Sequence, residues 1–230
     1  MVEQWAHSPE PAVIFDFNGT LSDDEPILYR IFTELFNSHL DWSMTEQDYT
    51  RHLLGHSDRE IIEKAQQLTG ATVDLEALLA LRKLRYRELV AGDNPIRPQT
   101  VELVRVLAHH DVPMAIVTGA QRDDVLAVLD SSPVGEWIAV VVAEEDVRRG
   151  KPDPEGFLAG AAQLDCRPAS MLVFEDSLPG VRGARAAGMH CIAVAAQPGT
   201  ELSQLAPAIV GGLSEDIVGH VLPVLVSRRA

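Results

Sequence analysis

Residues 12–21 read AVIFDFNGTL, and this stretch decides the fold class. Its first four residues are apolar without alternation, which is the pattern of a strand buried on both faces of a parallel sheet. Asp16 follows at the expected carboxyl end of that strand, the edge of an open α/β sheet where ligands bind. Gly19 permits a tight turn that brings backbone N–H groups close to an anion. The stretch therefore predicts a buried strand that carries Asp16 into a ligand site.

The dipeptide Asn18-Gly19 also permits a second interpretation, because Asn-Gly between apolar runs is a strong β-hairpin signal. The residues that follow favour a helix. Pro26 suits the first turn of a helix, and apolar residues recur at helical spacing over residues 27–40. We therefore expect a helix after the turn and give the hairpin less weight.

The composition excludes several classes of partner. The chain has 230 residues, 46% of them hydrophobic, and a formal net charge of −15 without any block rich in lysine and arginine. We therefore expect no nucleic acid and no anionic membrane as a partner. The first ten residues lack the pattern of a signal peptide, and no apolar stretch reaches membrane-spanning length, so we expect a cytoplasmic protein of undecided oligomeric state. Cys166 and Cys191 are too isolated for a disulfide framework or a zinc site.

Residues 24–93 carry apolar side chains at helical spacing and no short β-branched run. The expected helices cover residues 27–40, 45–53, 58–69 and 75–91. This pattern predicts an inserted, all-helical domain, and it leaves residues 1–23 and 94–230 for a second domain.

From residue 99 onward, helical and strand patterns alternate. The expected strands cover residues 113–119, 139–143, 170–174 and 191–196, and the expected helices cover residues 99–110, 121–130, 154–164 and 179–187. Strands separated by helices of this length form a parallel sheet with right-handed crossovers. We therefore predict an α/β fold with a Rossmann-like, three-layer core. The segment 208–226 predicts a short strand at Ile209-Val210 and a closing helix.

Polar side chains follow the strands at the expected ligand edge. The set comprises Asp16, Asn18, Thr118, Lys151, Glu175 and Asp176. A carboxylate nucleophile, a hydroxyl group, a cation and a second pair of carboxylates are the groups needed for phosphoryl transfer through an aspartyl-phosphate. Carboxylates gathered at one edge would repel one another without a hard cation, and Mg²⁺ suits such a site because it binds carboxylates together with water and phosphate.

Four motifs in order resemble those of the haloacid dehalogenase (HAD) superfamily hydrolases. They are FDFNGTLSDDEP at residues 15–26, IVTGA at 116–120, GKPDP at 150–154 and FEDSLPGVRGARAAGM at 174–189. The resemblance covers nearly the whole chain. It implies a Rossmann-like core, and it identifies the helical insertion as a C1 cap of the kind found in β-phosphoglucomutase-like and phosphoglycolate phosphatase-like members.

The resemblance implies a catalytic role for each strand-end residue. Asp16 would be the nucleophile that attacks phosphorus and becomes transiently phosphorylated. Thr118 and the Gly119 N–H would bond the transferring oxygens, and Lys151 would neutralise charge between nucleophile and phosphate.

The resemblance also implies a metal site and two substrate-binding segments. Mg²⁺ would be held by the Asp16 carboxylate, the backbone carbonyl of Asn18, Asp176, and Glu175 either directly or through water. Gly19 belongs to the loop that binds the substrate's phosphate. The substrate-binding residues expected with it are Thr20 and Gly119 in the core and Gly55, His56 and Arg59 in LLGHSDREII, which is similar to the substrate-specificity loop of C1 caps.

Asn18 departs from the family pattern, because the family's phosphatases have Asp at this position. That Asp protonates the leaving oxygen and later activates water. Asn can do neither, although its backbone carbonyl offers the metal the same oxygen. Since general acid–base catalysis is worth about 10²–10⁴-fold, we expect a slow phosphatase acting on a small phosphorylated metabolite.

Four explanations of Asn18 stay open. It is an engineered substitution that traps the phosphorylated enzyme, the leaving group needs no proton, another residue supplies the acid, or hydrolysis has given way to binding. Asp23, Asp24 and His56 are the candidates for a replacement acid.

Other functions of the superfamily are weighed against the phosphatase. A catalytically impaired binding or regulatory protein is the leading alternative, followed by a phosphomutase of the β-phosphoglucomutase type. A phosphonoacetaldehyde hydrolase needs a cap lysine, and neither Lys64 nor Lys83 is near Gly55. A dehalogenase uses no metal, which the acidic pair Glu175-Asp176 argues against.

Overall fold

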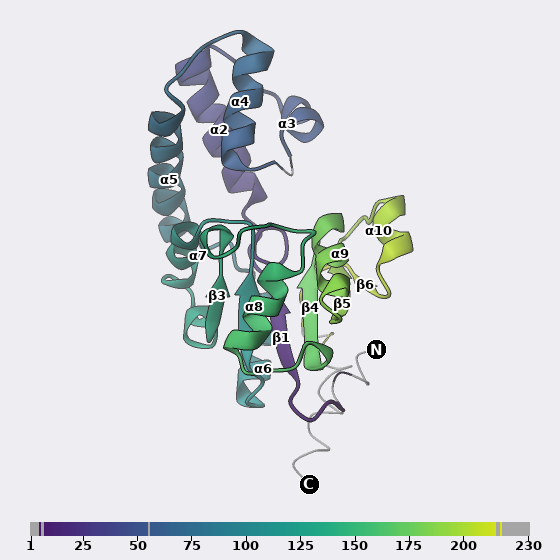
Figure 1. The fold of residues 1–230 in the computed structure, drawn as a ribbon. Coiled ribbons are helices and arrows are strands. Elements are labelled where there is room, and N and C mark those ends of the chain that lie inside the picture. The colour runs from purple at the N-terminus through teal and green to yellow at the C-terminus, as the bar shows by residue number, and fades with distance from the viewer. Residues whose placement is uncertain (1–4, 6, 55, 215–216, 218–230) are drawn as a thin grey trace. The chain divides into compact units, whose positions relative to one another are not determined.

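A computed structural model describes residues 5, 7–54, 56–214 and 217 of the chain (Figure 1). The chain divides into two compact units. Met1–Asp23 and Ile96–Ala230 form one, here called the core unit, and Asp24–Pro95 form the other, here called the helical unit. Each unit has a hydrophobic core of its own.

The core unit is built on a parallel sheet with the strand order β3-β2-β1-β4-β5-β6. The strands are β1 (Ala12–Phe15), β2 (Met114–Val117), β3 (Val140–Val142), β4 (Met171–Glu175), β5 (His190–Val194) and β6 (Ile209–Val210). All four residues of β1 are buried, and β1 pairs with β2 on one side and β4 on the other. The predicted buried strand is therefore confirmed.

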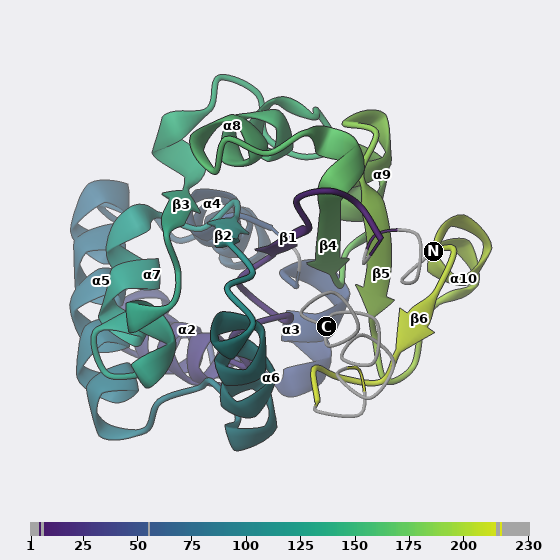
Figure 2. The ribbon, with the colours of Figure 1, turned by 90° about the horizontal axis from the view of Figure 1, so that it is seen from below.

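Helices cover both faces of this sheet. They are α6 (Pro98–His109), α7 (Arg122–Leu129), α8 (Glu155–Gln163), α9 (Leu178–Ala186) and α10 (Thr200–Leu205). Figure 2 shows α8 and α9 on one face and α6 and α7 on the other. The predicted α/β fold with a three-layer core is confirmed.

Close packing brings α8 against the sheet. A Cβ atom at Gly160 would lie 2.9 Å from Cγ2 of Val117, and one at Gly156 would lie 3.1 Å from Cγ1 of the same residue. Two glycines one turn apart therefore let the helix axis approach β2. On the sheet itself, the rings of Phe15 and Phe174 stack at 5.4 Å between centroids and join β1 to β4.

The helical unit contains α2 (Glu25–Leu40), α3 (Glu46–His52), α4 (Asp58–Thr69) and α5 (Leu75–Gly92). The structure assigns no strand to the described residues 24–54 and 56–95. Thr45 and Ser57 begin α3 and α4 with capping boxes, in which the hydroxyl accepts a backbone N–H and the acid three residues on accepts the cap's own N–H. Phe36 is fully buried, and its ring stacks on Trp42 at 5.6 Å.

The helix expected after the turn at Asn18-Gly19 is confirmed as α2, so the less favoured hairpin is excluded. Asn18 forms an isolated bridge with Ser22. The strand predicted at 139–143 is shorter, since the N–H of Ala143 bonds the Asp146 carboxylate at 2.8 Å in a 3-10 turn.

The last part of the chain matched the expectation in part. The short strand at Ile209-Val210 is present as β6. Helix α10 was not predicted, because only Leu202 of its six residues is buried and no apolar period results. Most of the predicted closing helix lies outside the described residues. None of the described helices is long and apolar enough to cross a membrane.

Replacing Phe36 by alanine is expected to lower the free energy of unfolding of the helical unit by about 3–5 kcal/mol, because the change leaves a cavity and removes the stack on Trp42. Leu84→Ala is the control, since Leu84 is 57% exposed on α5 and its loss should change the free energy by less than about 0.5 kcal/mol. Urea denaturation measures both variants. Equal effects would contradict the assignment of Phe36 to this core.

Candidate active site

Asp16 lies directly after β1, the strand between β2 and β4. Its backbone N–H donates to the Phe174 carbonyl at 2.9 Å, which continues the ladder with β4 by one residue. Its carbonyl accepts the Leu21 N–H at 3.3 Å, so the following loop turns back over it. The Asp16 side chain is only 9% exposed. The sheet therefore presents this carboxylate at its carboxyl edge in a largely buried position.

Two further carboxylates reach the same place from the end of β4. Ligand oxygens of Asp16, Glu175 and Asp176 all lie within 4.8 Å of one another. Gly19, at φ +76°, makes room for this convergence, because a Cβ there would lie 2.4 Å from Oδ2 of Asp176. The Thr20 hydroxyl donates to Oδ1 of Asp176 at 3.5 Å, which is a long and weak hydrogen bond.

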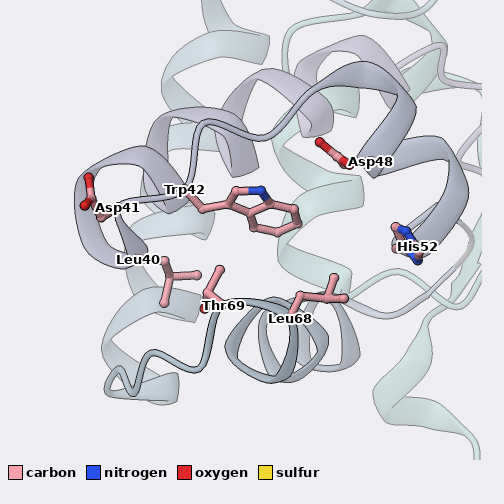
Figure 3. Close-up of a pocket in the computed structure, with 7 residues that line it drawn as sticks. All are labelled: Leu40, Asp41, Trp42, Asp48, His52, Leu68 and Thr69. Carbon is pink, nitrogen blue, oxygen red and sulfur yellow. The ribbon is translucent and has the colours of Figure 1, made fainter.

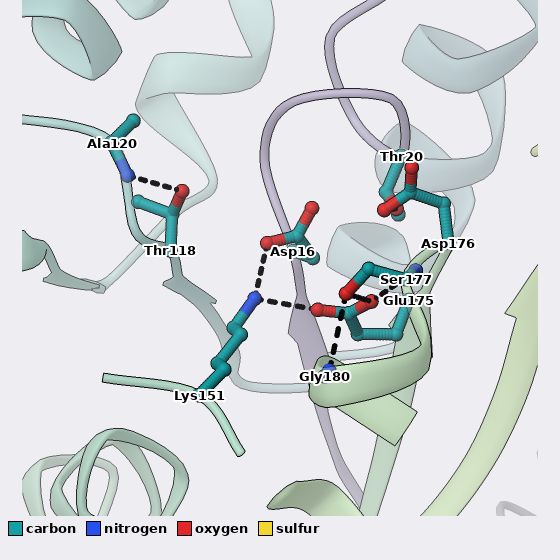
Figure 4. Close-up of polar contacts among 9 residues, drawn as sticks. All are labelled: Asp16, Thr20, Thr118, Ala120, Lys151, Glu175, Asp176, Ser177 and Gly180. Carbon is teal, nitrogen blue, oxygen red and sulfur yellow. Dashed lines mark hydrogen bonds and ion pairs between the residues drawn. The ribbon is translucent and has the colours of Figure 1, made fainter. Parts of the chain in front are cut away.

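Lys151 supplies the cation of this cluster from the loop that follows β3. Its Nζ donates to Oδ1 of Asp16 and, at 2.6 Å, to Oε1 of Glu175 (Figure 4). The lysine side chain is 15% exposed, and its ammonium lies 5.4 Å from the centre of the Phe157 ring. One ammonium is therefore shared by two buried carboxylates that come from neighbouring strands.

Burial sets the pKa of each member of the cluster. Loss of hydration raises the pKa of Asp16 well above its usual value; Lys151 opposes this rise, whereas Glu175 and Asp176 add to it. Burial and the charge of Glu175 raise the pKa of Asp176 to about 7. Burial alone would lower the pKa of Lys151, but Asp16 and Glu175 outweigh it and raise that pKa.

The cluster fits a hard divalent cation. Three carboxylates converge and one ammonium neutralises part of their charge, so negative charge remains in excess in a poorly hydrated place. The raised pKa values of Asp16 and Asp176 are consistent with this excess of negative charge, because burial and the neighbouring carboxylates favour a bound proton. A divalent cation at the same place would stabilise the deprotonated carboxylates instead. Carboxylate oxygens at this spacing are suitable ligands for such an ion.

Thr118 and Gly119 lie at the end of β2, one strand away from Asp16. The backbone N–H of Thr118 donates to the Val142 carbonyl at 3.0 Å, and its hydroxyl oxygen accepts the Ala120 N–H at 3.0 Å. Thr118 is buried, whereas Gly119 is exposed. The strand order thus places both residues at the predicted edge of the sheet, and their bonds to a phosphoryl group stay a prediction.

Asn18 lies half-buried in the turn after Asp16, where the Gly19 N–H donates to the Ser22 carbonyl at 2.8 Å. Two candidates for a replacement acid have other partners. Asp23 accepts a hydrogen bond from Nε of Arg97 at 2.9 Å. Asp24, in the helical unit, is fully buried and accepts the Tyr86 hydroxyl at 2.5 Å.

The predicted specificity loop belongs to the helical unit. Gly55 lies outside the described residues. His56 is exposed, with Nδ1 3.8 Å from Oε2 of Glu60, and Arg59 pairs with Glu76 at 2.7 Å. Contact of these residues with a substrate stays a prediction.

A buried polar group in the helical unit was not predicted from the sequence. Arg82 is 4% exposed, pairs with Asp58 at 2.9 Å, and lies 4.7 Å above the Tyr86 ring. The available signal was its position in the apolar stripe of α5, four residues before Tyr86. A charged side chain is rarely buried unless it is paired, so an arginine in an apolar stripe indicates a buried ion pair.

The helical unit also carries a surface pocket that no sequence motif indicated. Its volume is about 530 Å³, and Figure 3 shows the Trp42 ring along it. The lining residues are Leu40, Asp41, Trp42, Asp48, His52, Leu68 and Thr69. The Asp48 carboxylate also accepts the Thr45 N–H and hydroxyl in the cap of α3.

A family model described as haloacid dehalogenase-like hydrolase matches residues 13–194, which include β1, the helical unit and every strand through β5. The chain is a haloacid dehalogenase-like hydrolase. The resemblance carried by the four strand-end motifs is therefore confirmed.

Three similar proteins illustrate the range of this family. CbbY of Rhodobacter capsulatus is 32% identical over 189 residues, which cover 79% of this chain and 83% of the relative. A validoxylamine A 7'-phosphate phosphatase of Streptomyces hygroscopicus subsp. limoneus is 27% identical, and the match covers 91% of this chain and 97% of the relative. The crystal structure of an aspartate-to-asparagine mutant of CbbY from Rhodobacter sphaeroides, in complex with xylulose-(1,5)bisphosphate, is 25% identical with a TM-score of 0.76, covering 90% and 96%.

In the metal-free protein, the contribution of Asp176 to folding stability is expected to fall as the pH rises from about 4 to about 7. The folded Asp176 keeps its proton up to about pH 7, whereas the unfolded one releases it near 3.8, so the unfolded state binds fewer protons over this range. Mg²⁺ should therefore raise the melting temperature more at about pH 8 than at about pH 5. Calorimetry with and without Mg²⁺ measures this. Asp176→Asn should weaken both effects, and an equal Mg²⁺ response at the two pH values would contradict the prediction.

Proposed function

We propose that this chain is a Mg²⁺-dependent phosphatase that acts on a small phosphorylated metabolite through an aspartyl-phosphate on Asp16. The observation that carries this proposal is the convergence of Asp16, Lys151, Glu175 and Asp176 at one sheet edge. A buried carboxylate beside an ammonium, with two further carboxylates available for a metal, is the arrangement that in-line phosphoryl transfer requires.

The chain's own residues would carry the transfer in two steps. An oxygen of Asp16 forms a bond to phosphorus while the bond to the leaving oxygen breaks, and that oxygen takes a proton from water. Water then attacks the phosphorus, the bond between phosphorus and the Asp16 oxygen breaks, and inorganic phosphate leaves with the Asp16 carboxylate restored. The proton lost by the attacking water neutralises the hydroxide left by the first step. Lys151 balances the charge on the phosphoryl oxygens, with Thr118 and the Gly119 N–H as further donors.

The residues proposed to hold Mg²⁺ are Asp16, Asp176, the backbone carbonyl of Asn18, and Glu175 directly or through water. The ion would screen the attacking carboxylate from the phosphate's negative charge. The raised pKa values of Asp16 and Asp176 support this assignment, because burial makes both charged carboxylates unfavourable beside Glu175 and a bound cation would stabilise them.

The similar proteins support a phosphorylated small molecule as the substrate. One is named as a phosphatase of validoxylamine A 7'-phosphate, and another was crystallised with xylulose-(1,5)bisphosphate. From these names we propose that the substrate is a phosphorylated sugar or sugar-like compound. The helical unit, with the loop around His56 and Arg59, would choose among members of that class.

Asn18 favours one alternative function. A protein that recognises a phosphorylated ligand and releases it unchanged would need the cluster's charges but no acid at residue 18. A phosphomutase of the β-phosphoglucomutase type is less favoured, because it needs that acid as well. Turnover of a phosphorylated compound separates the phosphatase from the binding protein.

Asp16→Asn is expected to lower turnover by about 10³-fold or more, because the variant lacks the nucleophile. A panel of phosphorylated metabolites with Mg²⁺ measures turnover, and mass spectrometry after incubation with acetyl phosphate measures labelling at Asp16. Asp123→Asn is the control, since Asp123 lies exposed on α7. Labelling at another residue in the unchanged chain would refute the assignment of Asp16.

Asn18→Asp is expected to raise turnover of alkyl phosphates by about 10²–10⁴-fold, because it restores a proton donor to the leaving oxygen. The gain should be smaller for p-nitrophenyl phosphate, whose leaving group departs as a stable anion. Initial rates with the two substrates measure the difference. If neither the unchanged chain nor Asn18→Asp turns over either substrate, the phosphatase proposal fails in favour of the binding protein.

A further inference from the structure

The carboxylate of Glu175 has partners on both of its oxygens. The side chain is 1% exposed, so it depends on protein groups in place of water. Oε2 accepts the Ser177 backbone N–H at 2.6 Å and the Ser177 hydroxyl at 2.9 Å, and Oε1 faces Lys151 Nζ at 2.6 Å (Figure 4). One oxygen is therefore fixed by the start of α9, and the other is directed at the lysine.

The missing side chain of Gly180 leaves the space that the Glu175 carboxylate occupies. A Cβ atom at Gly180 would lie 1.7 Å from Oε1 and 1.9 Å from Cδ of Glu175, which no real side chain tolerates. Gly180 does not belong to the described glycines with positive φ, so its requirement is for space and not for an unusual backbone conformation. The carboxylate therefore lies against the bare backbone of the first turn of α9.

The same glycine orients the hydroxyl of Ser177. The Gly180 N–H donates to Oγ of Ser177 at 3.1 Å, which leaves the hydroxyl proton of Ser177 for Oε2 of Glu175. Ser177 and Gly180 thus act together, one through its two donors and the other through its missing side chain.

We infer that Ser177 and Gly180 are positioning residues that hold Lys151 beside Asp16 by fixing Glu175. A lysine ammonium ends a flexible four-carbon stem and needs anchoring. Asp16 provides one anchor, but under the proposed function, on which this inference rests, its reacting oxygen becomes bonded to phosphorus and its negative charge is lost. Glu175 is then the anchor that takes no part in bond formation, and Ser177 and Gly180 keep it aimed at Lys151.

Crystal structures of two variants test the positioning without any need for turnover. In Gly180→Ala, the carboxylate of Glu175 and Nζ of Lys151 should both be displaced by about 1 Å. Ser177→Ala should displace both groups less, because Oε2 of Glu175 loses the hydroxyl donor but keeps the backbone N–H. Ser177→Thr keeps both donors and should leave Lys151 in place. Gly199→Ala is the matched control, because nothing lies within 4 Å of its new methyl group.

A double-mutant cycle tests whether the effect acts through the lysine. Gly180→Ala should lower kcat/KM for p-nitrophenyl phosphate by about 10²-fold in the otherwise unchanged chain, and by less than about twofold when Lys151 is already alanine. A merely structural role for Gly180 would produce the same loss in both backgrounds. Ser177→Thr should restore most of the activity that Ser177→Ala loses.

The inference and the proposed function fail in different ways. An unmoved Lys151 in the crystal structures of Gly180→Ala and Ser177→Ala overturns the inference, whatever the rates. Equal losses in the two backgrounds of the cycle overturn it as well. A chain that turns over no phosphate ester refutes the proposed function, and the crystal structures then still decide whether Ser177 and Gly180 place the lysine.

Discussion

Negative charge in excess of positive charge, held in a poorly hydrated place, is the constraint on which the rest of the core unit depends. Three carboxylates converge within 4.8 Å, and a single ammonium lies among them. Two like charges about 4 Å apart repel by about 4 kcal/mol at the effective dielectric constant of such a site. The fold withstands this repulsion because the parallel ladder and the stacked rings of Phe15 and Phe174 hold β1 and β4 together.

Glu175 and Asp176 differ in how far the protein compensates their charge. Glu175 is satisfied by Lys151 and Ser177, so its charge is compensated within the protein. Asp176 accepts a long hydrogen bond from the Thr20 hydroxyl, and burial together with the charge of Glu175 raises its pKa to about 7. Asp16 shares the Lys151 ammonium with Glu175, so the less compensated charge lies at Asp176, which is where a divalent ion would be attracted.

The fold and the list of strand-end residues could be predicted because both follow from local patterns. A continuous apolar run that ends in Asp16 indicates a buried parallel strand, and the carboxyl ends of parallel strands meet at one edge. That rule places Asp16, Glu175 and Asp176 at one edge of the sheet. Their convergence within 4.8 Å also depends on the pairing of β1 with β4 and on the space at Gly19. The bond from Ser177 to Glu175 could not be predicted, and although the stripe position of Arg82 signals a buried ion pair, its partner Asp58 could not be predicted either. Both contacts depend on side-chain directions and helix packing that no periodicity encodes.

The strand order has a consequence for synthesis on the ribosome. β1 emerges first but lies at the centre of the sheet, and its partners β2 and β4 are translated only after the entire helical unit. Lys151 follows Asp16 by 135 residues, a delay on the order of ten seconds at ordinary elongation rates. Until β2 is translated, the apolar residues of β1 have neither neighbour, so this strand of the nascent chain is prone to aggregation unless the helical unit folds early or a chaperone binds the strand.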